Sequence, residues 1–166
     1  MTPRLLLSTF FLMLVGCAFT QDKPPANLRF SKIERVGDTV LYDLYFSSDL
    51  DILGHYKSLI GTGLLCALEN DANFSENHEM KNFMDGGVRR SASGTESDFI
   101  SRMVFSEKIA NRSSERDLTP VEIRKILAGK KQVQCKFFAS ATMIDTYFSN
   151  VMYVPVVEIL QAVGDR

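Results

Sequence analysis

The stretch VQCKFFASATM, residues 133–143, carries the longest β-strand signal in the chain. Its apolar positions alternate: Val133, Cys135, Phe137, Ala139, Ala141 and Met143. The polar positions between them are Gln134, Lys136, Ser140 and Thr142. Because successive side chains of a strand point to opposite faces of a sheet, this pattern predicts a strand with one face in the core and the other towards solvent.

The segment just before this strand, Leu118 to Gly129, predicts a short helix. Thr119 is suited to the N-cap, Pro120 to the first helical position, and Glu122 completes a Ser/Thr-x-x-Glu capping box. Gly129 supplies the left-handed stop. The apolar stripe that should lie on the core consists of Ile123, Ile126 and Leu127.

After residue 143 the pattern predicts a return strand. Asp145-Thr146 is expected to turn the chain, and Tyr147 to Leu160 to form a strand interrupted by Pro155. Proline within a strand indicates a sheet edge or a bulge, so this strand is expected at the sheet margin. A margin of this kind is a place where another chain can add a strand.

Further strands are predicted towards the N-terminus. Leu28 to Val36 and Thr39 to Ser48 flank Gly37-Asp38, which favours a hairpin. Gly63 to Glu69 and Phe99 to Ser106 are two more strand candidates. The short run from His78 to Met84 fits either a strand or one helical turn, and both interpretations stay open at this point.

A surface loop is predicted from Gly86-Gly87 to Thr95, because glycine, serine and arginine dominate there. A partner needs exposed polar groups, so the candidate partner-binding residues are those in and beside this loop. They are Asp85, Arg89, Arg90 and Glu96.

The first 17 residues combine Arg4, an apolar run from Leu5 to Val15, and the tetrapeptide Leu14-Val15-Gly16-Cys17. This tetrapeptide resembles the lipobox of bacterial lipoproteins. The resemblance implies a signal peptide at residues 1–16 and acylation of Cys17. It also implies a lipidated tether at residues 17–27 and a single β-rich domain at residues 28–166. The implied location is the cell envelope, with the chain on the outer membrane and facing the periplasm, because no acidic residue follows Cys17 directly. An ordinary secreted protein is the alternative.

If Cys17 carries lipid, Cys66 and Cys135 are the two remaining cysteines. An exported protein reaches a compartment in which disulfides form, so we expect these two to pair. Two buried free thiols are the alternative.

Six or seven strands with one short helix predict a mainly β fold. The arrangement resembles an immunoglobulin-like β-sandwich in which the helix is a crossover and the cysteines lie on non-adjacent strands. An α+β fold, with helices packed on one antiparallel sheet, is the alternative.

Charge and motifs exclude several function classes. The net charge is −1, and basic residues are clustered only in short doublets such as Arg89-Arg90 and Lys130-Lys131, so no nucleic-acid partner is expected. The chain has no Gly-x-Ser-x-Gly motif and no Ser-x-x-Lys motif. Its only histidines, His55 and His78, have no zinc-site spacing. We therefore expect no catalytic residues, no metal and no cofactor.

An anchor, a tether and one disulfide-capable domain without a catalytic motif favour a non-enzymatic binding protein with a protein partner. The preferred role is an immunity protein, or an inhibitor of an envelope-attacking toxin or enzyme. One alternative is an accessory lipoprotein of envelope assembly. Another is a small-ligand carrier or hydrolase, whose pocket would be lined by aromatic residues such as Phe137 or Tyr147, with His55 or His78 at its mouth.

Overall fold

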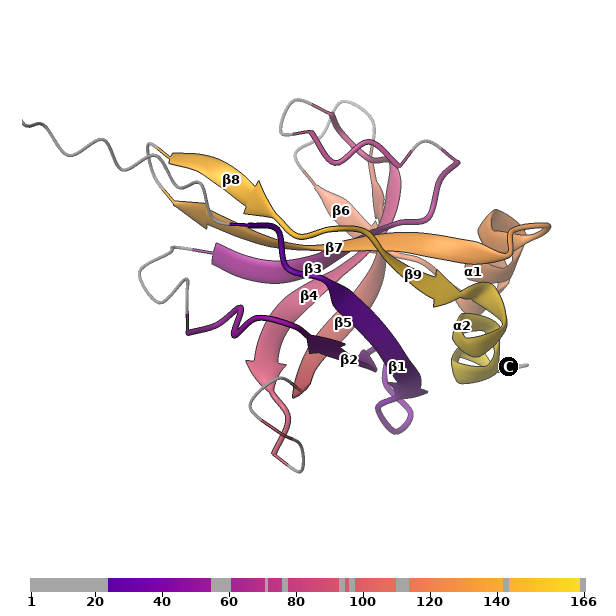
Figure 1. The fold of residues 1–166 in the computed structure, drawn as a ribbon. Coiled ribbons are helices and arrows are strands. Elements are labelled where there is room, and N and C mark those ends of the chain that lie inside the picture. Colours follow the sequence, from indigo (N-terminus) through magenta and orange to yellow (C-terminus); the bar gives the residue numbers. More distant parts are fainter. Residues whose placement is uncertain are drawn as a thin grey trace, which may run out of the picture.

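A computed structural model describes residues 24–54, 61–70, 72–75, 78–92, 95, 98–109, 114–141 and 144–164. Within these residues nine strands form one sheet, and every pairing is antiparallel (Figure 1). The strands are β1 (Leu28–Arg35), β2 (Tyr42–Ser48), β3 (Gly61–Ala67), β4 (Asn82–Arg90), β5 (Asp98–Lys108), β6 (Glu115–Asp117), β7 (Gln132–Ala141), β8 (Ile144–Phe148) and β9 (Met152–Pro155). The two helices are α1 (Pro120–Leu127) and α2 (Val156–Val163).

The sheet order is β1-β2-β5-β4-β3-β7-β8, with β6 added to β5 and β9 added to β7. The two margins of this sheet approach each other. The backbone N–H of Asn150, between β8 and β9, donates to the carbonyl of Ala26, just before β1, at 2.9 Å. The N–H of Ala26 donates to the Tyr147 hydroxyl at 2.7 Å. The sheet therefore curves round, and its concave face encloses the main core.

The mainly β prediction is confirmed, but the immunoglobulin-like sandwich is not shown. A sandwich needs two facing sheets, and all the described strands hydrogen-bond within one sheet. A single antiparallel sheet with packed helices is nearer to the alternative prediction.

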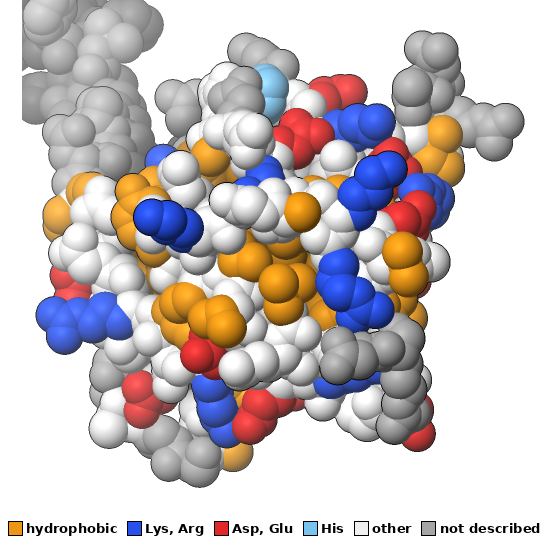
Figure 2. Space-filling view, turned by 90° about the vertical axis from the view of Figure 1, so that its right-hand side faces the viewer, with side chains coloured by type: hydrophobic (Ala, Val, Ile, Leu, Met, Phe, Trp, Pro, Cys, Tyr) orange, Lys and Arg blue, Asp and Glu red, His pale blue; other side chains and the backbone are white. Residues whose placement is uncertain are grey.

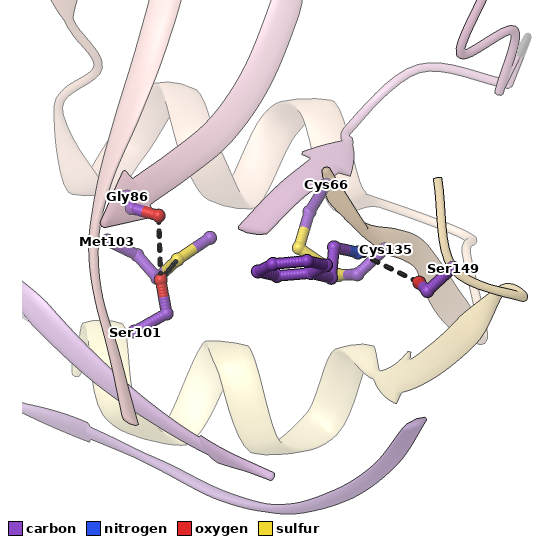
Figure 3. The surroundings of a disulfide bond; sticks show 7 residues. Cys66, Gly86, Ser101, Met103, Cys135 and Ser149 are labelled. Atoms are coloured by element: carbon purple, nitrogen blue, oxygen red, sulfur yellow. Dashed lines mark hydrogen bonds between the residues drawn. A yellow bond between two sulfur atoms is a disulfide. The ribbon is translucent and has the colours of Figure 1, made fainter. Parts of the chain in front are cut away.

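The disulfide between Cys66 and Cys135 lies inside this core (Figure 3). The two residues are direct register partners on β3 and β7, their α-carbons are 4.0 Å apart, and both are fully buried. The predicted pairing is therefore present, whereas the prediction of non-adjacent strands is wrong, because β3 and β7 are neighbours in the sheet. Near the bridge, Ser149 Oγ accepts from the backbone N–H of Phe137 at 2.9 Å, so this buried polar group is paired.

Helix α1 confirms the capping prediction. Thr119 is the N-cap, the capping box with Glu122 is present, and Gly129 follows the helix with a φ of 77°. Leu118 and Ile123 are both buried on the same core, as a hydrophobic staple requires.

Helix α2 was predicted as strand, and that prediction is wrong from residue 156 onward. Pro155 is the N-cap of α2, and Val156, Ile159 and Val163 form its buried stripe. This stripe follows the 3.6-residue period of a helix, and it packs into the same core as β1 and β9. Among the described residues, no helix combines the length and the apolar character that crossing a membrane requires.

The N-terminal hairpin is confirmed as β1 and β2, with Gly37 in the turn at a φ of 56°. Two other turn predictions are wrong. Asp145-Thr146 lies within β8, which already pairs with β7 at Ile144 and Ala141. Gly86-Gly87 lies within β4 rather than opening a loop.

Close packing explains the glycine at position 86. A Cβ there would lie 2.0 Å from the Arg102 carbonyl oxygen of β5, a distance that no side chain can occupy. Glycine in a strand often marks such an approach of two backbones. The carbonyl oxygen of Gly86 itself accepts a hydrogen bond from Ser101 Oγ at 3.0 Å (Figure 3).

Candidate functional site

The convex face of the sheet carries a second, smaller apolar cluster. Its buried members are Ala67, Phe74, Met80 and Phe83. Phe74 and Met80 come from the connection between β3 and β4, which crosses the convex face here instead of extending into solvent. This crossing connection and the sheet beneath it form the walls of a pocket.

The pocket is open and has a volume of about 450 Å³, within the usual range for ligand sites. Its apolar lining consists of Leu65, Phe74, Met80, Phe83, Phe138 and Phe148. Its polar lining consists of Asn73, Ser75, His78, Glu79, Lys108, Glu115 and Thr146. Four aromatic rings and a few polar groups are the usual composition of a small-ligand site.

The aromatic wall is built where β3, β7 and β8 lie side by side. Phe138 and Phe148 are register partners on β7 and β8. The ring of Phe138 covers Gly63, because a Cβ at that glycine would lie 2.8 Å from two ring carbons. Phe74 and Phe148 have ring centroids 6.5 Å apart. Gly63 therefore allows a flat aromatic surface that a larger residue would disrupt.

Lys136 stands over this aromatic wall. Its Nζ lies 5.3 Å from the Phe74 ring centroid and 5.8 Å from that of Phe148, which is cation–π distance. Among the described residues no carboxylate lies within ion-pair distance of Lys136.

The opposite wall holds an asymmetric ion pair and an unpaired histidine nitrogen. Lys108 Nζ lies 2.9 Å from Glu79 Oε1, with the lysine side chain 33% exposed and the glutamate side chain 77% exposed. His78 Nε2 is buried and has no hydrogen-bond partner among the described residues. A buried polar atom without a partner is uncommon in folded proteins and indicates a water or ligand position.

Two carboxylates lie beside this wall. Asp85 is half-buried on β4, and burial together with the nearby charge of Glu115 raises its pKa above the ordinary value for aspartate. Glu115 is the register partner of Lys108 across β5 and β6. The charges around the pocket are therefore mixed, with Lys108, Glu79 and Glu115 together on one wall.

The other predicted partner-binding residues do not form one contact surface. Arg89 and Arg90 are consecutive residues of β4, so their side chains point to opposite faces of the sheet. Arg89 lies 3.8 Å from Asp43, whereas Arg90 pairs with Asp51 at 2.6 Å. Glu96 lies outside the described residues.

Arg102 of β5 is the main partner of Asp43. Its Nε and NH2 groups donate to the two carboxylate oxygens at 2.9 and 3.0 Å. These hydrogen bonds hold the pKa of Asp43 below its usual range. Arg89 and Arg102 are both about half exposed around this carboxylate, so a charged strip runs across β2, β4 and β5.

The aromatic residues that the sequence suggested for a pocket do not line this one. Phe137 is fully buried in the main core. Tyr147 packs against it, and the Tyr147 hydroxyl accepts a hydrogen bond from the backbone N–H of Ala26. His55 and the expected lipidation site Cys17 lie outside the described residues, whereas His78 does line the pocket.

The residues that sequence reasoning missed are Phe74, Lys108, Phe138 and Phe148. A signal for Phe138 was available, because it is an aromatic residue among the polar, outward-facing positions of residues 133–143. No comparable local signal marks the other three. Lys108 and Phe148 reach the pocket on strands β5 and β8, and Phe74 reaches it on the β3–β4 connection.

A second apolar surface lies on the side of the molecule that carries α1 and α2. Figure 2 shows this side, with hydrophobic side chains gathered near its middle and Lys and Arg side chains around them. The large exposed apolar residues of these elements and of β9 are Val121, Tyr153 and Val157. None of them lines the pocket, so they provide control positions for binding experiments.

No three histidine, cysteine or acidic side chains of the described residues come together as metal ligands. Comparisons with protein-family models, with curated proteins and with solved structures find no match to this chain. The functional argument therefore rests on the pocket itself.

Proposed function

We propose that this chain is a non-enzymatic binding protein, anchored in the cell envelope, which holds a small ligand in the pocket on the convex face of its sheet. The observation that carries the proposal is the aromatic wall, in which Phe138 and Phe148 are partly exposed. A sheet face turned to solvent normally carries polar side chains, yet here Phe138 and Phe148 border an open cavity. An apolar surface of this kind favours binding of an apolar ligand, because binding removes the apolar surfaces of the protein and of the ligand from water.

The crossing connection between β3 and β4 supports the same proposal. Phe74 is 8% exposed and Met80 7%, so both are well packed against the sheet while their edges face the cavity. A pocket whose walls are packed before binding loses little conformational freedom when the ligand enters.

The proposed anchor rests on the resemblance of residues 14–17 to a lipobox. Replacing Cys17 with Ser is expected to leave uncleaved precursor and to abolish partition of the protein into a detergent phase. Unchanged processing of the Cys17→Ser protein would instead favour an ordinary secreted form.

A second candidate is the immunity or inhibitor role. The observation that favours it is the charged strip, where Arg89 and Arg102 are about half exposed and so reachable by a protein partner. Both guanidinium groups already contact Asp43, so a partner would have to compete with that carboxylate. This competition makes the pocket the better-supported binding site.

Binding of a neutral apolar probe tests the pocket. N-phenylnaphthylamine should bind at one saturable site with a rise in fluorescence. Phe148→Ala should weaken this binding by roughly tenfold, since an aromatic contact and its buried area are lost. Tyr153→Ala removes an aromatic side chain that is 50% exposed and does not line the pocket, and it should leave binding unchanged.

Both variants must melt as the parent protein does for the comparison to hold. The proposal is contradicted if the probe shows no saturable site, or if Tyr153→Ala weakens binding as much as Phe148→Ala.

A further inference from the structure

The polar wall of the pocket contains two groups that an anionic ligand can use. Lys108 is the more buried member of its ion pair, with 33% of its side chain exposed against 77% for Glu79. Displacing the exposed Glu79 carboxylate from Lys108 should cost little free energy, because exposed ion pairs contribute little to stability. A ligand carboxylate in place of Glu79 would thus reach a cation that is already partly withdrawn from water.

His78 supplies the second group. The residue lines the pocket, and its Nε2 is buried without a hydrogen-bond partner among the described residues. In the tautomer protonated at Nε2, the ring can donate one hydrogen bond to a carboxylate oxygen. Such a bond would remove the cost of a buried donor without an acceptor.

The remaining charges restrict where the anionic group of a ligand can lie. Glu115 is on the same wall and Asp85 is beside it, so a ligand anion is disfavoured at that end. Lys136 lies over the Phe74 and Phe148 rings and is a further cation near the aromatic end. The anionic group of a ligand therefore fits on the Glu79 side of Lys108, and an apolar part of the same ligand would lie along the aromatic rings of the pocket. A volume of about 450 Å³ suits a small molecule and is near the low end for ligand pockets.

From these contacts we infer that the pocket takes a small amphiphile, with an apolar body on the Phe74, Phe138 and Phe148 rings and one carboxylate at Lys108 and His78. This inference rests on the proposed binding function and adds the chemical class of the ligand.

Three probes with the same alkyl chain and different head groups test the inference: decanoate, decanol and decylamine. The protein is used as the cells deliver it, in lipid nanodiscs if it is anchored and in buffer if it is soluble. Signals from protein-free samples are subtracted. Displacement of N-phenylnaphthylamine should give the order decanoate, then decanol, then decylamine.

Two substitutions on the ion pair should change decanoate binding in opposite directions. Lys108→Gln should weaken it by about tenfold, as expected for a lost charge-assisted hydrogen bond, and should leave decanol unchanged. Glu79→Gln should tighten it, because the competing carboxylate is removed. If the two substitutions only disturbed the structure, both would be expected to weaken decanoate binding. Lys81→Gln is the matched control, since Lys81 is 65% exposed and does not line the pocket.

The outcomes separate this inference from the proposed function. Equal binding of decanoate and decanol, tighter binding of decylamine, or weaker binding in Glu79→Gln would overturn the carboxylate assignment while leaving the pocket as a binding site. Failure of all three probes, together with failure of N-phenylnaphthylamine, would overturn both.

Discussion

Removal of the Cys66–Cys135 disulfide is expected to destabilise the domain without unfolding it. The bridge closes a loop with a sequence separation of 69 residues. In the chain-entropy model, a loop of this length restricts the unfolded chain enough to contribute about 4 kcal/mol at 25 °C. For a domain of this size, that corresponds to a fall of about 10 °C in the melting temperature. The β3–β7 ladder on either side of the bridge, from Gly61 to Ala67, is held by backbone hydrogen bonds and should persist.

Urea unfolding of the oxidised protein and of a Cys66→Ala, Cys135→Ala double variant measures this difference. Because both cysteines are fully buried, the reduced protein is best prepared by unfolding and refolding with reductant present. It should unfold near the midpoint of the double variant, and the double variant should not respond to reductant. Equal midpoints for the oxidised protein and the double variant would refute the reasoning. So would two unlinked cysteine peptides in a non-reduced digest of protein from an oxidising compartment.

Two further predictions concern the β4–β5 contact and the α1 cap. Gly86→Ala should destabilise the protein by about 3 kcal/mol, because the new Cβ overlaps the Arg102 carbonyl. Gly87→Ala, whose Cβ would have nothing within 4 Å, should change stability by less than about 0.5 kcal/mol in the same melting experiment. For Glu122, hydrogen bonds from Arg116 and from Thr119 lower the pKa from 4.5 to about 2. Its stabilising effect should therefore be complete above pH 4.5 and be lost as the pH falls towards 2, and Glu122→Gln should remove this part of the measured pH dependence of stability. An unchanged pH profile in that variant would contradict the assigned role.

The binding pocket could be predicted from the sequence only in part. Phe138 breaks the polar pattern of the outward face of β7, and this feature indicates an apolar contact outside the core. Phe74 and Lys108 lie 64 and 30 positions before it, and nothing local connects them to Phe138. They line the same pocket because β5, β4, β3 and β7 are successive neighbours in the sheet and Phe74 of the β3–β4 connection packs on the convex face.

The sequence by itself determined those features that depend on neighbouring residues. The capping box of α1 and the turn of the β1–β2 hairpin arise from contacts within a few positions along the chain, and the buried face of β7 is visible in the alternation of its own residues. The pairing of Cys66 with Cys135 was also predicted, on the expectation that Cys17 carries lipid and leaves these two cysteines.

Only the tertiary structure decided the features that depend on distant backbone. Gly86-Gly87 resembles a turn locally, yet it is strand because it pairs with β3 on one side and β5 on the other. The Arg102 carbonyl approaches Gly86 too closely for any side chain, which explains the glycine there. Residues 156–160 are rich in β-branched and aliphatic residues and resemble a strand, yet they are helix because Val156, Ile159 and Val163 bury one stripe against the curved sheet. The physical reason is the same in both cases, since burial and steric fit against distant residues outweigh local conformational preferences of about 1 kcal/mol or less per residue.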